Sequence, residues 1–139
     1  MVAAVEASLR RAGFKVTRDS VAGRQAVIAR ARRLFVLLAV FKAGMAGRDH
    51  LDRFVDEAGQ YAATVKGGLP SAVTAVAAAV LEGGAPGAGD WAAALTDGRR
   101  ARVFPVLVDL PAGRISCPDV PADLHRLVDD HVAPSVRMV

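Results

Sequence analysis

Five cations between positions 24 and 42 have the clearest capacity for chemistry: Arg24, Arg30, Arg32, Arg33 and Lys42. Side chains alternate between the two faces of an extended strand, so Arg24, Arg30 and Arg32 project from one face if this stretch is a strand. Cations along one face can meet several phosphates of a nucleic-acid backbone. The nearby aromatics, Phe14 and Phe35, fit core positions better than base stacking. The sequence therefore predicts weak, strongly salt-dependent binding to the backbone.

The charge of the chain is concentrated in its first third. Up to residue 48, ten basic residues stand against two acidic ones, Glu6 and Asp19, for a net charge of +8. From residue 49 onward, eight basic residues meet twelve acidic ones, for a net charge of −4. Such asymmetry is typical of a chain with an acidic or polyanionic partner. The alternative is that these arginines form an ordinary solvated surface.

Two acids stand where a functional carboxylate is conceivable. Asp109 ends the segment "FPVLVD", a position where α/β proteins often place a functional acid, and it is the possible functional acid of this chain. The same residue also starts a tight turn, which is the interpretation we favour. Asp19 precedes "SVAG", and a turn role is favoured there as well.

Histidine and cysteine offer no metal site by their spacing. His125 and His131 are six residues apart and face different sides of a helix, whereas His125 and Asp129 have the spacing of an exposed helix contact. The single cysteine, Cys117, excludes an intramolecular disulfide and a zinc site built from several cysteines. No serine lies in a G-x-S-x-G turn. We predict no metal, no cofactor and no catalytic constellation.

The stretch "KGGLPSAV" at 66–73 invites comparison with a phosphate-binding loop. Such a loop needs a strand, then glycines, then Lys-Ser/Thr at the start of a helix whose amides point at the anion. Here the glycines follow a helical pattern and Lys66 precedes them. The segment is therefore predicted to end a helix.

The elements that must position the basic residues are predicted from periodicity. Residues 3–12 form a short helix that stops at Gly13, and "FKVTRD" alternates as a strand. "SVAG" turns the chain, "RQAVIARARR" returns as the hairpin partner, and "LFVLLAVF" at 34–41 is a buried strand. The competing interpretation is one long helix over 24–43, because Ala, Arg and Leu are good helix formers.

The remaining elements follow in the order helix, strand, helix, hairpin, helix. Apolar residues from 51 to 65 form a single helical stripe. The apolar run "SAVTAVAAAVLEGG" fits a helix capped by Ser71 or a buried strand, and we favour a strand that begins near Val73. A short helix covers "WAAALTD" at 91–97, and "RRARVFPVLVDL" pairs with "RISCP" through the turn "PAG". Pro105 indicates an edge or a bulge in its strand. "PADLHRLVDDHV" forms the last helix. At 139 residues the chain is expected to be one domain, 1–139.

The span 54–115 carries the pattern F…A..YA…K.GLP…V, then a tryptophan, then "FPVLVDL" and a turn glycine. It resembles a family of small uncharacterised prokaryotic proteins. The resemblance covers less than half of the chain, and "PDVPADLHRL" replaces a Thr-Pro-Leu-Trp-Gly-like segment of the family. It implies the element order α-βββ-α-β-α-ββ, which also resembles the core of PD-(D/E)XK nucleases. A nuclease site would need a carboxylate where Val40 stands, so such a core would be degenerate.

Together these features predict an α/β (α+β) single domain with a mixed sheet of about five to six strands, in the order α-βββ-α-β-α-ββ-α. The N-terminus lacks the pattern of a secretory signal, and the most apolar run is too short to cross a bilayer, so we expect a cytoplasmic protein without membrane contact. The primary functional hypothesis is a non-enzymatic interaction module that binds a protein partner or self-associates. The alternative is a nucleic-acid-binding protein that uses the basic N-terminal third.

Overall fold

The computed structural model of the chain describes residues 2–21, 23–31, 34–42, 48–66, 74–83, 102–116 and 121–137. Its elements, in chain order, are α1 (Val2–Arg11), β1 (Lys15–Val21), β2 (Arg24–Ala31), β3 (Leu34–Phe41), α2 (Arg48–Lys66), β4 (Thr74–Leu81), β5 (Arg102–Asp109), β6 (Arg114–Ser116), α4 (Ala122–His131) and α5 (Ala133–Arg137).

The six strands form one mixed sheet in sequential order, from β1 at one edge to β6 at the other. Strands β1, β2 and β3 are an antiparallel meander, β3, β4 and β5 run parallel, and β6 returns antiparallel to β5. The predicted α+β class, mixed sheet and order of elements are confirmed, and the helix expected over 91–97 lies outside the described residues. The competing long helix over 24–43 is wrong, because this stretch forms two paired strands.

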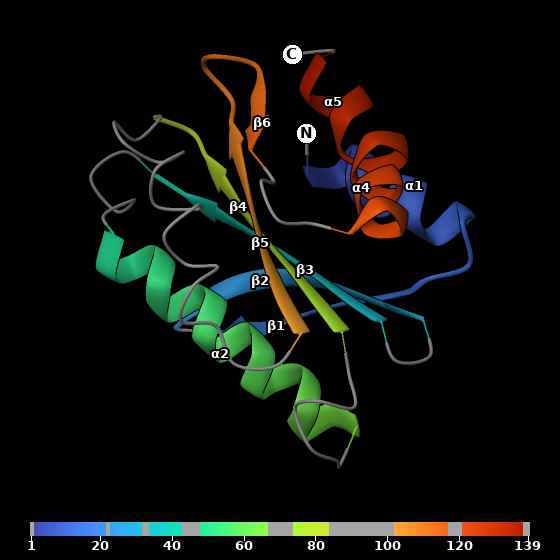
Figure 1. Ribbon diagram of the computed structural model, residues 1–139, viewed down its shortest axis with the longest axis vertical. Helices are drawn as coiled ribbons and strands as arrows, with labels where there is room; N and C mark the ends of the chain where they lie inside the picture. Colours follow the sequence, from blue (N-terminus) through green and yellow to red (C-terminus); the bar gives the residue numbers. More distant parts are fainter. Residues whose placement is uncertain are drawn as a thin grey trace.

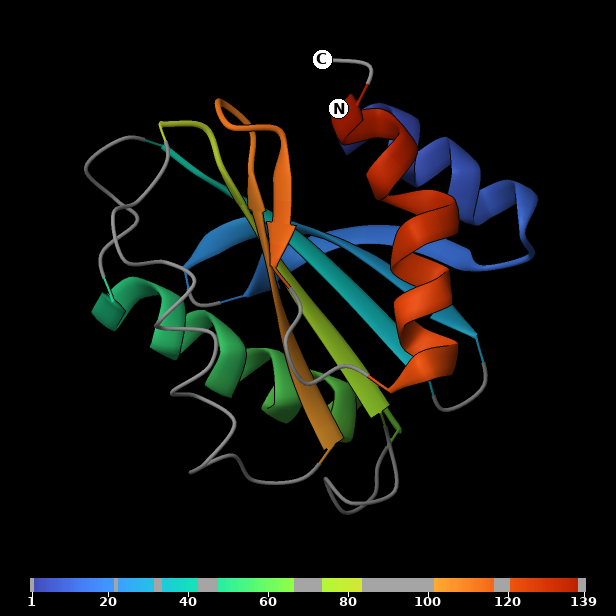
Figure 2. The same cartoon turned by 45° about the horizontal axis from the view of Figure 1, so that its top comes forward.

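Helices cover the sheet on both faces (Figures 1 and 2). Helix α2, which connects β3 to β4, packs across one face and contacts β4, β5 and β1. Helix α1 packs on the other face beside α4 and α5, so the two ends of the chain share one layer. Below, "the α2 face" is the face of the sheet on which α2 lies.

Small residues bring α2 close to the middle of the sheet. Strand β4 is buried along Ala75–Leu81, and its alanines at 75, 77 and 79 join the core under α2. A strand covered on both faces is expected to be apolar throughout, as this one is. On the helix, a Cβ atom at Gly59 would lie 2.7 Å from Cγ2 of Val103 on β5. The absence of a side chain at Gly59 therefore sets how closely α2 approaches β5.

The opposite face is closed by α1 and α4. Val5 and Leu9 of α1 and Leu124 and Val128 of α4 are buried against the β-branched side chains of that face. The positions follow helical spacing, so each helix buries one stripe.

A side-chain contact joins these two helices. The hydroxyl of Ser8 on α1 lies 2.7 Å from Nδ1 of His131 at the end of α4. This polar contact ties the first helix to the C-terminal helical layer.

The ends of two predicted elements are informative. Helix α2 ends at Lys66, as the glycines that follow predicted, and residues 67–73 lie outside the described part of the chain.

Pro105 lies in β5, whose described pairing with β6 covers only 107–109. The predicted edge or bulge at Pro105 concerns the residues that directly follow Ser116, which lie outside the described part of the chain.

The most apolar run of the sequence, "LFVLLAVF", forms β3, a central strand buried along most of its length. Among the helices of the described residues, none combines the length and the apolar content needed to cross a membrane.

Candidate anion-binding hollow

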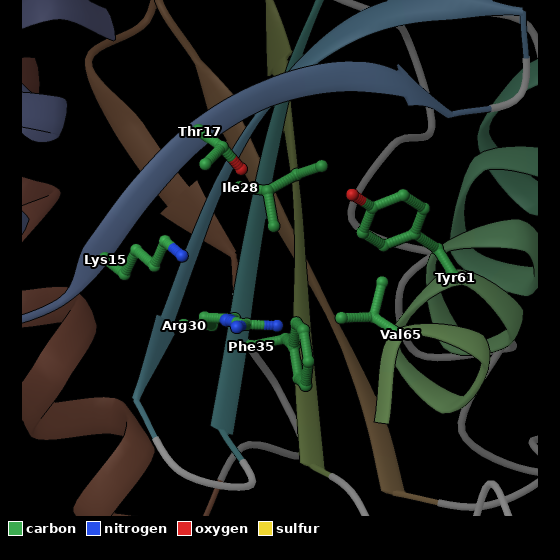
Figure 3. A pocket seen from close by; sticks show the side chains of 7 residues that line it. All are labelled: Lys15, Thr17, Ile28, Arg30, Phe35, Tyr61 and Val65. Carbon is green, nitrogen blue, oxygen red and sulfur yellow. The ribbon is translucent and has the colours of Figure 1, made fainter. Parts of the chain in front are cut away.

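A hollow of about 160 Å³ opens on the α2 face, between the C-terminal half of α2 and the ends of β1 and β2 that carry Lys15 and Arg30. We call it the basic hollow. Its lining comes from three neighbouring strands and from the C-terminal half of α2, and consists of Lys15, Thr17, Ile28, Arg30, Phe35, Tyr61 and Val65. Figure 3 shows the side chains of Tyr61 and Val65 directed from the helix toward those of the strands.

The β1–β2 hairpin places the two cations of the hollow side by side. Two residues join Val21 to its partner Arg24, and Gly23 adopts φ +73°, a conformation that glycine takes without strain. This register puts Lys15 directly opposite Arg30. Side chains of directly opposed residues start about 5 Å apart, and like charges in that arrangement are unfavourable. A bound anion would relieve this repulsion.

Helix α2 supplies the second wall through Tyr61. The phenol donates a hydrogen bond of 2.9 Å to Oδ2 of Asp19 on β1, which fixes the ring at the side of the hollow. Burial raises the pKa of Tyr61, and the hydrogen bond and charge of Asp19 raise it further, while Arg30 opposes the shift. The ring is therefore held as a neutral donor to Asp19.

Asp19, the acidic residue on this face of β1, accepts hydrogen bonds from groups other than Lys15 and Arg30. Asp19 accepts from Tyr61 and from the amide of Ser20. It is four residues from Lys15, or about 13 Å along the strand, which is too far for an ion pair. In the part of the chain that the structure describes, no acidic side chain forms an ion pair with Lys15 or Arg30. The positive charge of the hollow is thus not neutralised by those residues.

The other N-terminal acid lies on the opposite face. The carboxylate of Glu6 on α1 is buried and accepts from Arg10 at 3.1 Å and from Arg18 at 3.0 Å. The hydrogen bond from Arg18 lowers the pKa of Glu6, the charges of both arginines add to the effect, and burial opposes it. Glu6 thereby joins α1 to β1, and its carboxylate does not reach Lys15 or Arg30 in the hollow.

The predicted row of cations separates into two groups. Arg24 and Arg30 share the α2 face, as the alternation predicted, but they stand at opposite ends of β2, about 20 Å apart. The guanidinium of Arg24 lies 3.9 Å from the centroid of the Phe41 ring and donates to the carbonyl of Val40 at 3.4 Å. Burial lowers the pKa of Arg24. This side chain is therefore held against the core, unlike Arg30.

Three other predicted cations lie outside the hollow. Lys42 is exposed just beyond β3, at the Arg24 end of the meander. Arg32 and Arg33, between β2 and β3, lie outside the described residues.

The remaining predicted acid and the degenerate nuclease core bring no carboxylates together. Asp109 ends β5, and its Oδ1 accepts from the amide of Ala112 at 3.3 Å, which is the geometry of a turn. Val40 stands half-buried on β3. Asp19 and Glu6 point to opposite faces of the sheet. These acids cannot share one metal ion.

The histidines also lie apart from the hollow. Nδ1 of His125 is 3.0 Å from Oδ2 of Asp129 on the exposed side of α4, and His131 contacts Ser8. Among the described residues, no group of three or more His, Cys, Asp or Glu side chains is placed to hold a metal ion. Cys117 lies outside them.

Comparison of the chain with protein-family models, with curated proteins and with solved structures finds no match. The site must therefore be judged on its own geometry.

Of the residues that line the hollow, the sequence analysis predicted only Arg30 as a binding residue, and it missed Lys15, Thr17, Ile28, Tyr61 and Val65. The signal for Lys15 was available, because a two-residue turn at 22–23 pairs position 15 with position 30. Tyr61 carried no comparable signal, since its place beside the strands depends on the angle at which α2 crosses the sheet.

Proposed function

We propose that the protein is a non-enzymatic interaction module that binds an acidic protein partner through the basic hollow. The observation that carries this proposal is the pair Lys15 and Arg30. They stand opposite each other beside a hollow, and no described acid pairs with either. Arginine also presents a planar donor fork that matches a carboxylate.

A second copy of the chain is one partner that fits this description. Residues from 49 onward carry a net charge of −4, and α2 exposes Asp49 and Asp56 to solvent. Opposite charges on two surfaces speed encounter and fix the register of a complex. Self-association would then weaken as salt increases.

The test uses the full chain in two charge-reversal variants. Arg30→Glu changes the hollow, whereas Arg126→Glu changes an exposed arginine of α4 on the other face and serves as the matched control. Binding of a labelled glutamate-rich peptide with one phenylalanine is measured by fluorescence anisotropy. Self-association is measured as the molar mass from light scattering. We expect Arg30→Glu to weaken peptide binding about tenfold or more, because hydrogen bonds to charged groups contribute roughly 1.5–3 kcal/mol.

The control variant is expected to bind the peptide like the wild type. Equal binding by both variants, or no binding of the peptide and a monomeric mass even at low salt, would contradict the proposal.

A second candidate function is nucleic-acid binding, favoured by the net charge of +8 up to residue 48. The salt dependence of the binding constant distinguishes binding by Lys15 and Arg30 alone from binding by the whole basic N-terminal third. If only Lys15 and Arg30 meet phosphates, the logarithm of the binding constant should fall with a slope of about −2 against the logarithm of the salt concentration. A much steeper slope would indicate that the whole basic third takes part. Labelled duplex and single-stranded DNA are the probes, and no binding at low salt would exclude this function.

A further inference from the structure

We propose that the basic hollow is a binding site for a small organic anion that carries one carboxylate or phosphate group on an apolar body the size of a single ring. This inference rests on the proposed function and deepens it, because it names the chemical group that a partner would place between Lys15 and Arg30. A free small molecule with the same chemistry would occupy the same site.

The apolar part of the proposal rests on Val65 and its neighbours. Val65, on α2, is 40% exposed, and it is the one large hydrophobic side chain recorded as exposed among the described residues. It lies at the hollow, whose floor is made by Ile28 and Phe35. The exposed apolar surface therefore lies beside two cations that no described acid neutralises, which is the combination that an amphipathic ligand would use.

The size of the hollow limits the apolar body. Its volume is about 160 Å³. A protein cavity of about 150 Å³ lined by apolar side chains holds benzene. One six-membered ring is therefore of a suitable size, whereas a fused ring system would extend into solvent.

The polar groups define how such a ligand would lie. Figure 3 shows Lys15 and Arg30 on the strand side of the hollow and Tyr61 and Val65 on the helix side. The anionic group would meet the two cations and the Thr17 hydroxyl, while the ring would pack beside Tyr61 and Val65. The Tyr61 hydroxyl already donates to Asp19, so the anion does not need it. Bidentate hydrogen bonds from Arg30 suit both a carboxylate and a phosphate.

The experiment titrates the full-length protein with five probes and follows backbone amide shifts by NMR. Benzoate and phenyl phosphate have both the charge and the ring, benzamide has the ring without the charge, and acetate and inorganic phosphate have the charge without the ring. We expect saturable shifts at β1, β2 and α2 with benzoate or phenyl phosphate, and binding at least about tenfold weaker for the other three probes.

The two ring-bearing anions distinguish the sources of the charge. Tighter binding of benzoate would indicate a carboxylate ligand, and tighter binding of phenyl phosphate would indicate a phosphorylated one.

Two variants locate the site. Arg30→Gln should weaken binding of the favoured anion about tenfold, and Val65→Phe should block it by filling the hollow while the charges remain. Arg126→Gln is the matched control and should bind like the wild type. Equal binding of benzamide and benzoate, equal binding of inorganic phosphate and phenyl phosphate, or no effect of either variant would overturn the inference.

The outcome is separable from that of the proposed function. If the glutamate-rich peptide binds through Arg30 but no ring-bearing anion does, the interaction module stands and the inference fails. If the small anion binds and no peptide does, the hollow is a small-molecule site and the partner-binding function fails.

Discussion

The α2 face of the sheet has a covered half and an open half, and the two are built from different residues. Over β3, β4 and β5 the face carries alanines and large apolar side chains, and α2 packs directly on them. At the end of the β1–β2 hairpin far from its turn it carries Lys15, Thr17 and Arg30, and a hollow remains beside the helix. One continuous sheet therefore provides both a core and a candidate binding surface.

The position of α2 determines which part of this face is packed as core and which part remains open to solvent. Close approach needs small residues, which the chain supplies at Gly59 and along β4. Beside the charged side chains of Lys15 and Arg30, a hollow remains between the strands and the C-terminal half of α2. The tightly packed core and the candidate binding surface thus occupy neighbouring regions of the same face.

The largest expected effect comes from removing the aromatic pair of the covered half. The rings of Phe41 and Phe54 meet edge to face, with centroids 5.6 Å apart and an angle of 71° between their planes. Phe54 is fully buried, so Phe54→Ala should lower the free energy of unfolding by about 3–5 kcal/mol. Val65→Ala in the open half should cost less than about 1 kcal/mol, because Val65 is already partly exposed. Urea denaturation of both variants would measure this contrast, and similar losses would contradict it.

A smaller effect is expected from adding a side chain at the closest contact of the covered half. Gly59→Val would force a β-branched side chain against Val103, which is itself rigid. Overpacking costs roughly 1–3 kcal/mol, and the gain in helix propensity is only a few tenths, so a net loss of about 2 kcal/mol is expected. Gln60→Val, on the exposed side of the same helix, is the control and should change stability by less than about 0.5 kcal/mol. Thermal or urea unfolding that ranks the two variants equally would show that α2 is not held so closely.

The smallest effect concerns the hydrogen bond that borders the open half. Tyr61 is the single tyrosine of the chain, so its phenolate absorbance can be titrated without interference from another tyrosine. Asp19→Asn should move the pKa of Tyr61 down toward its ordinary value of about 10, without reaching it, because burial is the largest cause of the raised value. An unchanged midpoint would show that Asp19 and Tyr61 do not interact in solution.

The raised pKa of Tyr61 also sets the sign of its effect on stability. Its contribution is complete below the unfolded value of about 10 and is lost as the pH rises through the higher folded value. Wild type and Asp19→Asn should therefore differ least in their pH dependence at neutral pH and most in alkaline solution.

Most of the fold could be predicted because its signals are local. Alternating residues predicted the strands at 14–19 and 24–32. The apolar stripe from 51 to 65 predicted a helix, and the glycines after Lys66 predicted where it ends. The ambiguous run from 71 to 84 was predicted to begin as a strand because of its β-branched residues, and β4 over Thr74–Leu81 confirms this. How far α2 extends across the sheet could not be predicted, because it depends on contacts such as Gly59 against Val103 between residues distant in sequence.

The candidate site was only partly predictable for the same reason. Arg30 was identified from alternation, and Arg24 shares its face, yet only the structure shows Arg24 engaged with Phe41. The partnership of Lys15 with Arg30 was missed although the hairpin register predicts it, whereas the position of Tyr61 depends on the crossing angle of α2.

The shared layer of α1 and α5 has a practical consequence for working with this protein. The first and last helices lie together on the face opposite α2 (Figure 2). An affinity tag or a surface tether attached at either end would therefore project away from the basic hollow. Immobilised by either end, the molecule would present the same open half of its sheet to the solution.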